Sequence, residues 1–282
     1  RSVIYEVSID MVKTKPLLGY GYGGFERSFI DHFNHYAIDN PEVGKTIQRL
    51  SHPHNEILLW TVEGGIIAML AFMIFTKAYI TTWLNISRLK ALALFALLLP
   101  ILLHSQLELP FYSSVSHFIV FILILWLTDT ENSKNILSIK CEKTLLIRVM
   151  ALLIPIIFVP FLATSLHTAT ILVDHEKNGG QSIEKLNDII NPIAWQNRLD
   201  DAVYSYILVS GLTERNSEKL ERYIAWGLER IKYLPRESIY ANLLLTLRII
   251  NKDGEHQRLL MEAKKTYPQR ENWHNDSLSP KR

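Results

Sequence analysis

Two histidines separated by one residue stand where the character of the chain changes. The stretch Ser51-His52-Pro53-His54-Asn55-Glu56 follows a polar segment and precedes the apolar run Ile57–Phe75. Pro53 is well placed as a first helical residue, which predicts His52 as the N-cap and His54 as the second helical residue. The sequence therefore places two imidazoles where water meets lipid, at the start of a helix.

That position has two chemical consequences. The free N–H groups and the positive end of the helix dipole attract an anion such as a phosphate. The same field disfavours an imidazolium, so His54 is predicted to stay neutral and to accept a proton. A neutral base beside a diphosphate suits transfer of a group away from a diphosphate leaving group. The competing interpretation is that both histidines are interfacial caps without chemistry.

A departing diphosphate needs positive charge from a metal ion or from arginine. A zinc site is the alternative, because four histidines have spacings like those of metal ligands: His32, His35, His52 and His54. The loop contains no Asp-x-Asp pair to hold a divalent ion on a diphosphate, so we predict a site without metal or other cofactor. Guanidinium forks match phosphate oxygens. The predicted diphosphate ligands are Arg1, Arg27 and Arg49, for which surface charge and lipid-headgroup anchoring remain competing interpretations.

A second polar cluster, His104–Pro110, links two apolar segments. Because it is short, it is predicted to lie at the membrane surface beside His54, where Glu108 orients a histidine or binds acceptor hydroxyls. The predicted supporting residues are His52, Asn55, His104, Gln106 and Glu108. The competing interpretation is a polar turn in which Pro110 starts the next helix.

Two features near the histidines favour packing over chemistry. Glu63 lies about two helical turns beyond Asn55, where a lone carboxylate facing lipid costs on the order of 2–3 kcal/mol. It should face the protein, with Gly64-Gly65 permitting close helix contact. The glycine-rich segment 18–25 has the backbone freedom to bind an anion, but a tight turn packed by its tyrosines is favoured.

Four apolar segments predict an all-α integral membrane protein. The expected spans cover about 57–75, 88–104, 111–127 and 145–166, since about 17–20 residues suffice. Before them, residues 1–55 form a loop domain that begins with a helix at 1–11. After them, residues 167–282 are predicted to form helical hairpins. The predicted domains are thus 1–55, 56–166 and 167–282.

The distribution of positive charge predicts the orientation. The connections 76–90 and 128–144 each hold three Lys or Arg residues, whereas 104–110 holds none. By the positive-inside rule the first two are cytoplasmic. The loop 1–55, the connection 104–110 and the C-terminal domain then face outward, into the periplasm of a bacterial inner membrane.

The C-terminal domain shows helical periodicity. Apolar faces predict helices ending at Pro235, near Ile250 and before Pro268. Tyr233 and Tyr267 are 34 residues apart, the tetratricopeptide period, so the domain is predicted to be tetratricopeptide-like.

Composition excludes some functions. The net charge of +2 and the absence of a basic run argue against nucleic acid as a partner, and the single cysteine, Cys141, cannot form a disulfide within the chain. The chain begins with Arg and is expected to be the C-terminal part of a longer protein.

Several of these motifs together resemble the periplasmic-loop signature of the O-antigen ligase superfamily. They are Arg1-Ser-Val-Ile-Tyr, Pro16-Leu-Leu-Gly-Tyr-Gly, His52-Pro-His-Asn-Glu-Ile-Leu-Leu and Glu63-Gly-Gly. The segment His104–Pro110, followed by a span and an outer helical domain, is similar to the protein O-oligosaccharyltransferase branch, also called pilin glycosylation ligases. The resemblance covers residues 1–126 by motif and the remainder by layout.

The resemblance implies an enzyme that moves a glycan en bloc from undecaprenyl diphosphate to a Ser or Thr hydroxyl of a periplasmic protein such as pilin, without a metal. It implies that His54 is the essential catalytic residue and that Arg1 binds the diphosphate. Two alternatives remain. The acceptor is lipid A core or another glycan, as for a ligase or polymerase, or the chain is a non-catalytic membrane anchor for a helical-repeat scaffold.

Overall fold

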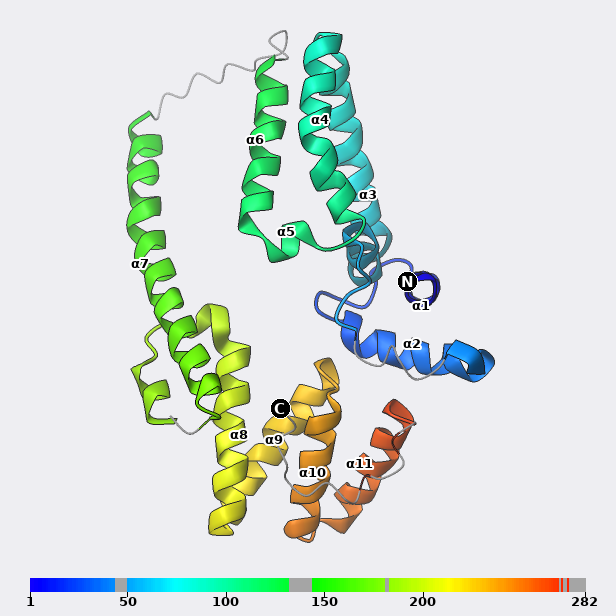
Figure 1. Ribbon diagram of the computed structural model, residues 1–282, viewed down its shortest axis with the longest axis vertical. Coiled ribbons are helices and arrows are strands. Elements are labelled where there is room, and N and C mark those ends of the chain that lie inside the picture. Colours follow the sequence, from blue (N-terminus) through cyan, green and yellow to red (C-terminus); the bar gives the residue numbers. More distant parts are fainter. Residues whose placement is uncertain (44–49, 132–143, 181–182, 269, 271–272, 274–282) are drawn as a thin grey trace. The chain divides into compact units, whose positions relative to one another are not determined.

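The computed structural model describes residues 1–43, 50–131, 144–180, 183–268, 270 and 273 (Figure 1), and all secondary structure in these ranges is helical. The chain divides into two compact units. The first comprises 1–137, 231–237 and 260–282, and the second comprises 138–230 and 238–259. The protein is an α-helical membrane protein, as the sequence predicted, while the domain boundaries at 55 and 166 remain predictions.

The first unit begins with two amphipathic helices, α1 (Ser2–Thr14) and α2 (Phe25–Asp39), followed by the short 3-10 helix η1 (Pro41–Val43). The helix predicted at 1–11 is confirmed as α1. A core forms between α1, α2 and the start of α3 (Glu56–Leu84), with these buried members: Ile4, Val7, Met11, Phe25, Phe29, Phe33, Leu59, Val62 and Leu109. This core fixes α1 beside the first turns of α3.

Helix α3 is interrupted at Gly65, where φ is 62°. The glycine-rich loop enters the break and takes up the freed backbone groups. Tyr20 N–H donates to Val62 O (3.0 Å), Gly21 N–H donates to Glu63 O (3.0 Å), and Ile66 N–H donates to the carbonyl of Pro16 (2.7 Å). Backbone groups at membrane depth need such internal partners.

The Glu63 side chain fastens the same loop. It is buried, and its Oε1 accepts N–H bonds from Gly23 (3.0 Å) and Phe25 (3.3 Å). The expectation that Glu63 faces the protein and serves packing is confirmed. The expectation of a close helix–helix contact at Gly64-Gly65 is wrong, because a loop, rather than a second helix, approaches Gly65.

The next helices of the first unit are α4 (Arg88–Ser105), α5 (Pro110–Ser113) and α6 (Val115–Glu131). Buried Leu98, Ile101 and Ile124 join α4 to α6. The span predicted at 111–127 differs from the structure: Ser114 is extended and separates α5 from α6. Pro110 does start α5, and α6 then runs for 17 residues.

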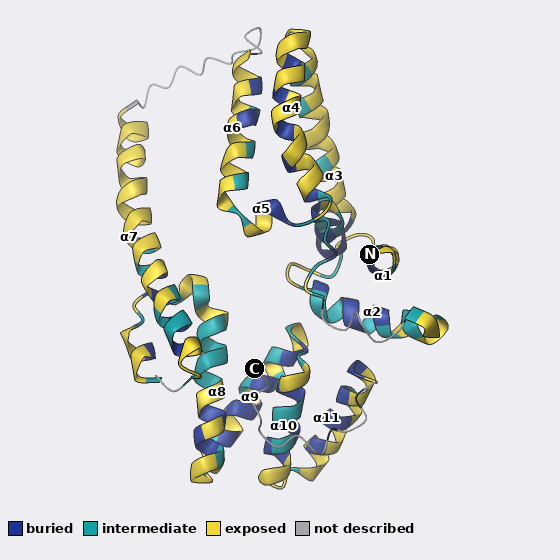
Figure 2. Ribbon diagram, in the orientation of Figure 1, coloured by how far each residue is buried: buried dark blue, intermediate teal, exposed yellow. Residues whose placement is uncertain are grey.

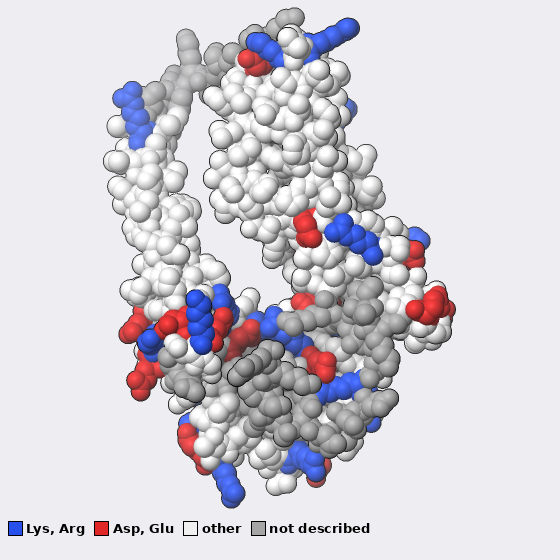
Figure 3. Space-filling view, in the orientation of Figure 1, with Lys and Arg blue, Asp and Glu red and all other residues white. Residues whose placement is uncertain are grey.

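Three helices in the described ranges are long and apolar enough to cross a membrane: Glu56–Leu84, Arg88–Ser105 and Leu145–Lys177. Their outer surfaces are largely exposed (Figure 2) and almost free of charged side chains on the visible face (Figure 3). The number of spans, predicted as four, remains a prediction. The predicted positive charges of the connection 128–144 lie in residues outside the described ranges.

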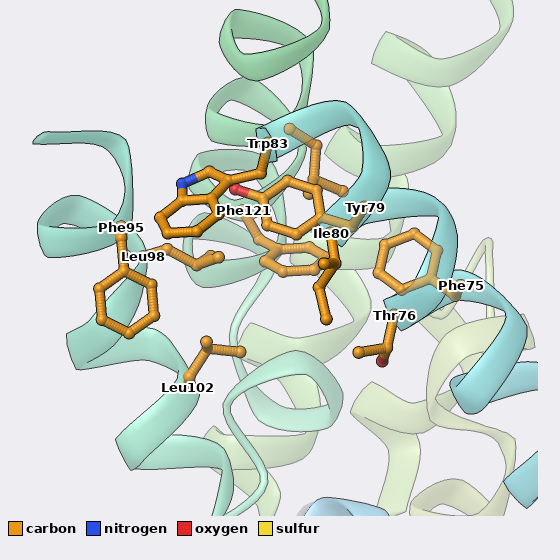
Figure 4. Close-up of a pocket in the computed structure, with 10 residues that line it drawn as sticks. Phe75, Thr76, Tyr79, Ile80, Trp83, Phe95, Leu98, Leu102 and Phe121 are labelled. Carbon is orange, nitrogen blue, oxygen red and sulfur yellow. The ribbon is translucent and has the colours of Figure 1, made fainter. Parts of the chain in front are cut away.

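An apolar pocket of about 280 Å³ lies between α3, α4 and α6 (Figure 4). Aromatic side chains from all three helices line it, among them Tyr79, Trp83, Phe95 and Phe121. These α3 residues lie more than twenty positions beyond Asn55, roughly 35 Å along a helix. The pocket extends along the helices from Trp83, near the end of α3, to Leu102, about two turns before Glu108.

In the second unit, α7 (Thr144–Lys177) continues about three turns beyond the predicted end at 166. Polar contacts explain the extension. Asn191 Nδ2 donates to Phe161 O (3.1 Å), Thr168 Oγ1 donates to Asn191 O (2.8 Å), and Trp195 Nε1 donates to Ser165 O (3.1 Å). The last third of α7 thus supports the 3-10 helices η4 (Ile183–Asp188) and η5 (Ile193–Trp195).

Four further helices follow along the chain: α8 (Gln196–Glu214), α9 (Ser217–Tyr233), α10 (Glu237–Ile249) and α11 (Asp253–Thr266). The end of α9, the first residue of α10 and the second half of α11 belong to the first unit. The three C-terminal helices predicted from periodicity are confirmed, and α8 precedes them. Gly211 of α8 approaches Leu220, and Gly227 of α9 approaches Leu243, so small residues permit close helix packing. Whether the array is tetratricopeptide-like remains a prediction.

The glycine-rich loop seated in the break of α3 predicts that Gly→Ala substitutions destabilise the protein to different degrees. A Cβ at Gly19 would lie 2.3 Å from Val62 O, and one at Gly65 would lie 2.4 Å from Leu17 O. Left-handed backbone costs about 1–2 kcal/mol for alanine and overpacking about 1–3 kcal/mol. Gly19→Ala and Gly65→Ala should therefore destabilise the protein by about 2–5 kcal/mol in thermal unfolding in detergent.

Two control variants separate these contributions. Gly21 has φ of 83° but open space around its Cβ position, so Gly21→Ala should show only the backbone cost. Gly254 lies in open space without the left-handed backbone, so Gly254→Ala should be nearly neutral. Equal destabilisation by all four substitutions would contradict this close fit between the loop and α3.

Candidate active site

One carboxylate contacts both histidines of the motif. Glu108 Oε1 lies 2.9 Å from His54 Nδ1, and Glu108 Oε2 lies 3.3 Å from His52 Nε2. The two imidazole rings meet edge to face with their centroids 4.6 Å apart. The histidine side chains are 27% and 28% exposed and that of Glu108 is 44% exposed, so the cluster is open to solvent.

The turn after α4 presents Glu108. The carbonyl of His104 accepts N–H bonds from Leu107 (2.9 Å) and Glu108 (2.8 Å). The backbone of His104, rather than its imidazole, therefore supports Glu108. The His104 ring instead packs edge to face against His117, with centroids 5.2 Å apart.

The start of α3 differs from the prediction. The helix begins at Glu56, and its N-cap is Asn55, whose Oδ1 accepts the N–H of Leu58 (2.9 Å). His54 has φ of 53°, so it is not helical. The assignment of His52 as N-cap and His54 as second helical residue was wrong, because the Asn55 side chain is the better cap.

This shift changes the electrostatics of the site. Glu56 stands in the first turn of α3 and its Oε2 accepts the N–H of Phe111 (3.2 Å). The positive end of the helix is therefore complemented by the protein's own carboxylate. The carboxylate in contact with His54 is that of Glu108.

The charge state of Glu108 determines the histidine tautomers. Partial burial tends to raise the pKa of Glu108, but hydrogen bonds from His54 and His52 and their charges outweigh it, so the pKa lies below its ordinary value. An ionised carboxylate only accepts hydrogen bonds, so His54 carries its proton on Nδ1 and a neutral ring has a free lone pair on Nε2. His52 donates from Nε2, and its Nδ1 lies 2.9 Å from Ser51 Oγ.

Tyr5 ties α1 to both segments of the site, and the sequence prediction did not assign it a role. Its hydroxyl lies 3.3 Å from the carbonyl of Gln106 and 3.5 Å from that of His54. Asn55 adds a second tie, since its Nδ2 donates to Gln106 Oε1 (3.0 Å). The sequence signals here were the helical spacing of residues 1–11 and the motif Arg1-Ser-Val-Ile-Tyr, and neither shows what Tyr5 contacts.

The predicted arginines fall in three different situations. Arg1 is exposed and stands one turn before Tyr5 on the same face of α1, since Tyr5 N–H donates to Arg1 O (3.1 Å). Arg27 lies on α2 and pairs with Asp31 (3.4 Å) and Glu262 (3.2 Å). Arg49 lies outside the described residues. Arg1 thus lies on the helix that Tyr5 connects to the site, and Arg27 has carboxylate partners.

The four histidines weighed as zinc ligands do not meet as one set. His32 contacts Asp10 (3.0 Å) and the hydroxyl of Tyr20 (2.6 Å), and His35 contacts the carbonyl of Asp31 (2.7 Å). Within the described ranges, the group with metal-ligand geometry is His52, His54 and Glu108, whose ligand atoms all lie within 4.8 Å. The prediction of a metal-free site is not tested by this geometry.

Fold and site together define a class: an α-helical membrane protein with a histidine–carboxylate pair at the end of its spans. Two family models match the chain. "Virulence factor membrane-bound polymerase, C-terminal" covers residues 92–279, and "O-Antigen ligase" covers residues 1–73.

The chain belongs to the O-antigen ligase superfamily, whose members are glycosyltransferase-like enzymes that act on lipid-linked glycans. Neither a curated protein nor a solved structure matches it. The predicted resemblance is confirmed at the level of the superfamily. Residues 74–91, from the second half of α3 to the start of α4, are covered by neither model.

The Tyr5 tie predicts a local effect of Tyr5→Phe. Loss of the hydroxyl removes a bond to two carbonyls and should lower the free energy of unfolding by about 0.5–1.5 kcal/mol. The freed loop should also make His54 react faster with diethyl pyrocarbonate, measured by mass spectrometry. Tyr112→Phe, at an exposed position, is the control. An unchanged reaction rate of His54 would contradict the role of the Tyr5 hydroxyl in holding this loop.

The lowered pKa of Glu108 predicts a pH dependence of stability. A carboxyl whose folded-state pKa is depressed stabilises the fold above its ordinary value of 4.5, and that contribution is lost as the pH falls through the lowered pKa. The unfolding midpoints of the protein and of Glu108→Gln should differ at neutral pH and converge well below pH 4.5. Glu42→Gln, an exposed residue of η1, should show no such convergence.

Proposed function

We propose that this protein transfers an oligosaccharide en bloc from undecaprenyl diphosphate to Ser or Thr hydroxyls of periplasmic proteins. In this proposal it lies in the bacterial inner membrane, with residues 1–55, 104–110 and the C-terminal helices facing the periplasm. The superfamily supports glycan transfer at a membrane. The protein acceptor rests on the resemblance of His104–Pro110 and of the following span and helical domain to oligosaccharyltransferases.

The observation that carries the proposal is the 2.9 Å contact between Glu108 and His54 Nδ1. It fixes the tautomer in which Nε2 accepts a proton, and the carboxylate stabilises the imidazolium that forms. The acceptor O–H gives its proton to Nε2 while its oxygen bonds to the anomeric carbon. The bond between that carbon and the diphosphate oxygen breaks, and the diphosphate leaves on its lipid.

The leaving group needs cations on the side of α1. Of the two predicted arginines in the described ranges, Arg1 is the favoured candidate, because Tyr5 on the same helix face contacts the carbonyl of His54. A guanidinium there offers a fork of donors for the diphosphate oxygens. Arg27 is a weaker candidate, since ligand binding would have to replace Asp31 and Glu262.

The C-terminal helices have a proposed role in acceptor binding. They present a folded surface outside the spans, built on α8 to α11. In this proposal they receive or guide the acceptor protein to the His54 side of the membrane.

Glycan polymerisation is the second candidate, because the model that covers about two thirds of the chain describes a membrane-bound polymerase. Ligation to lipid A core follows in the same way from the other model. All three activities use the same lipid-linked donor chemistry and differ in the hydroxyl that attacks. A non-catalytic anchor is the alternative from a different class.

His54→Ala should abolish glycan transfer while leaving a folded, membrane-inserted protein. General-base catalysis contributes about 10²–10⁴-fold, so residual transfer should fall below detection in cells. The measurement is mass spectrometry of periplasmic proteins from a deletion strain complemented with each variant. His35→Ala, at an exposed position of α2, is the matched control. Normal glycan transfer by His54→Ala would refute His54 as the general base and would favour the non-catalytic membrane anchor.

The same strains separate the acceptors. Loss of glycan from periplasmic proteins alone supports protein glycosylation. Loss from lipid A core alone supports a ligase, and shortened glycan chains support a polymerase; either result would overturn the proposed acceptor while keeping His54 as the base.

A further inference from the structure

The histidine–carboxylate cluster has the geometry of a metal site as well as that of a catalytic pair. Tetrahedral zinc holds N and O ligands at about 2.0–2.2 Å, which places neighbouring ligand atoms about 3.3–3.6 Å apart. In the structure, one ligand atom from each of the three residues lies within 4.8 Å of the other two. His54 Nδ1 lies 2.9 Å from Glu108 Oε1, and His52 Nε2 lies 3.3 Å from the other carboxylate oxygen, Oε2. Side-chain shifts would bring the three ligand atoms to three corners of the tetrahedron.

The ligands are held in place by their surroundings. Ser51 Oγ contacts the second ring nitrogen of His52 (2.9 Å), an outer contact typical of metal-binding histidines. Tyr5 and Asn55 fasten the backbone on either side of the cluster. Because these ties exist without an ion, little ordering is needed when one binds.

The donor set selects among metals. Two imidazole nitrogens and one carboxylate suit zinc, whereas Mg²⁺ and Ca²⁺ prefer sites made of oxygen. Partial exposure of all three side chains leaves the fourth position open to water. The cluster is thus a three-ligand, open zinc site.

We propose that His52, His54 and Glu108 bind Zn²⁺ reversibly, and that the ion inhibits glycan transfer. Zinc on His54 Nδ1 moves the ring proton to Nε2 through water, which removes the lone pair that would accept the acceptor's proton. It also takes the Glu108 oxygen that fixes the catalytic tautomer. Binding depends on the cluster alone, and inhibition rests on the proposed function.

Binding is tested without any activity measurement. The full chain in detergent, stripped with a chelator, is titrated with Co²⁺, whose visible d–d bands report tetrahedral coordination, and Zn²⁺ should then displace Co²⁺. His52→Ala and Glu108→Gln should each weaken binding by more than about 100-fold, above the 10–100-fold cost of losing an outer-shell partner. His117→Ala removes a member of the neighbouring histidine pair and should bind as the unaltered chain does.

Inhibition is tested in membranes of the producing strain, which supply the lipid-linked glycan and acceptors. Micromolar Zn²⁺ should stop transfer, a chelator should restore it, and Mg²⁺ should have no effect. A flat Co²⁺ titration, or binding that survives both ligand substitutions, would overturn the site. Binding without inhibition would overturn the regulatory claim. Failure of the proposed function would instead appear as transfer by His54→Ala without zinc.

Discussion

The candidate site depends on one negative charge shared by two imidazoles. Glu108 comes from the turn after α4, and its histidine partners come from the segment before α3, 54 and 56 residues earlier. Both rings donate to the same carboxylate, which holds them beside each other and assigns each a tautomer. The distance between α3 and α4 at this end of the spans therefore sets the protonation geometry of the site.

The scaffold of the site was largely predictable. The amphipathic spacing of α1, the apolar spans and the C-terminal helices are local patterns, and each appears near its predicted place. Long-range geometry was harder. The position of Glu108 between two spans predicted that it orients a histidine. No sequence rule showed that Glu108 contacts both His52 and His54, or that the His104 ring packs on His117.

Two errors have physical causes that involve competing local signals. Pro53 favours a first helical position, but Asn55 satisfies the N–H of Leu58 and moves the helix start to Glu56. The paired glycines after Glu63 suggest helix packing, but the break at Gly65 admits a loop from forty-odd residues earlier. In the first case a neighbouring side chain of the motif decided the outcome, and in the second a segment remote in the sequence did.

The break in α3 also constrains how the chain is assembled. A helix with open carbonyls and an open N–H at that depth would be poorly tolerated by hydrocarbon until the segment 16–24 arrives. That segment is made first but can only be seated once α3 is in place. The segment 16–24 and the start of α3 therefore reach their final arrangement together, and the same step fixes the backbone beside the candidate site.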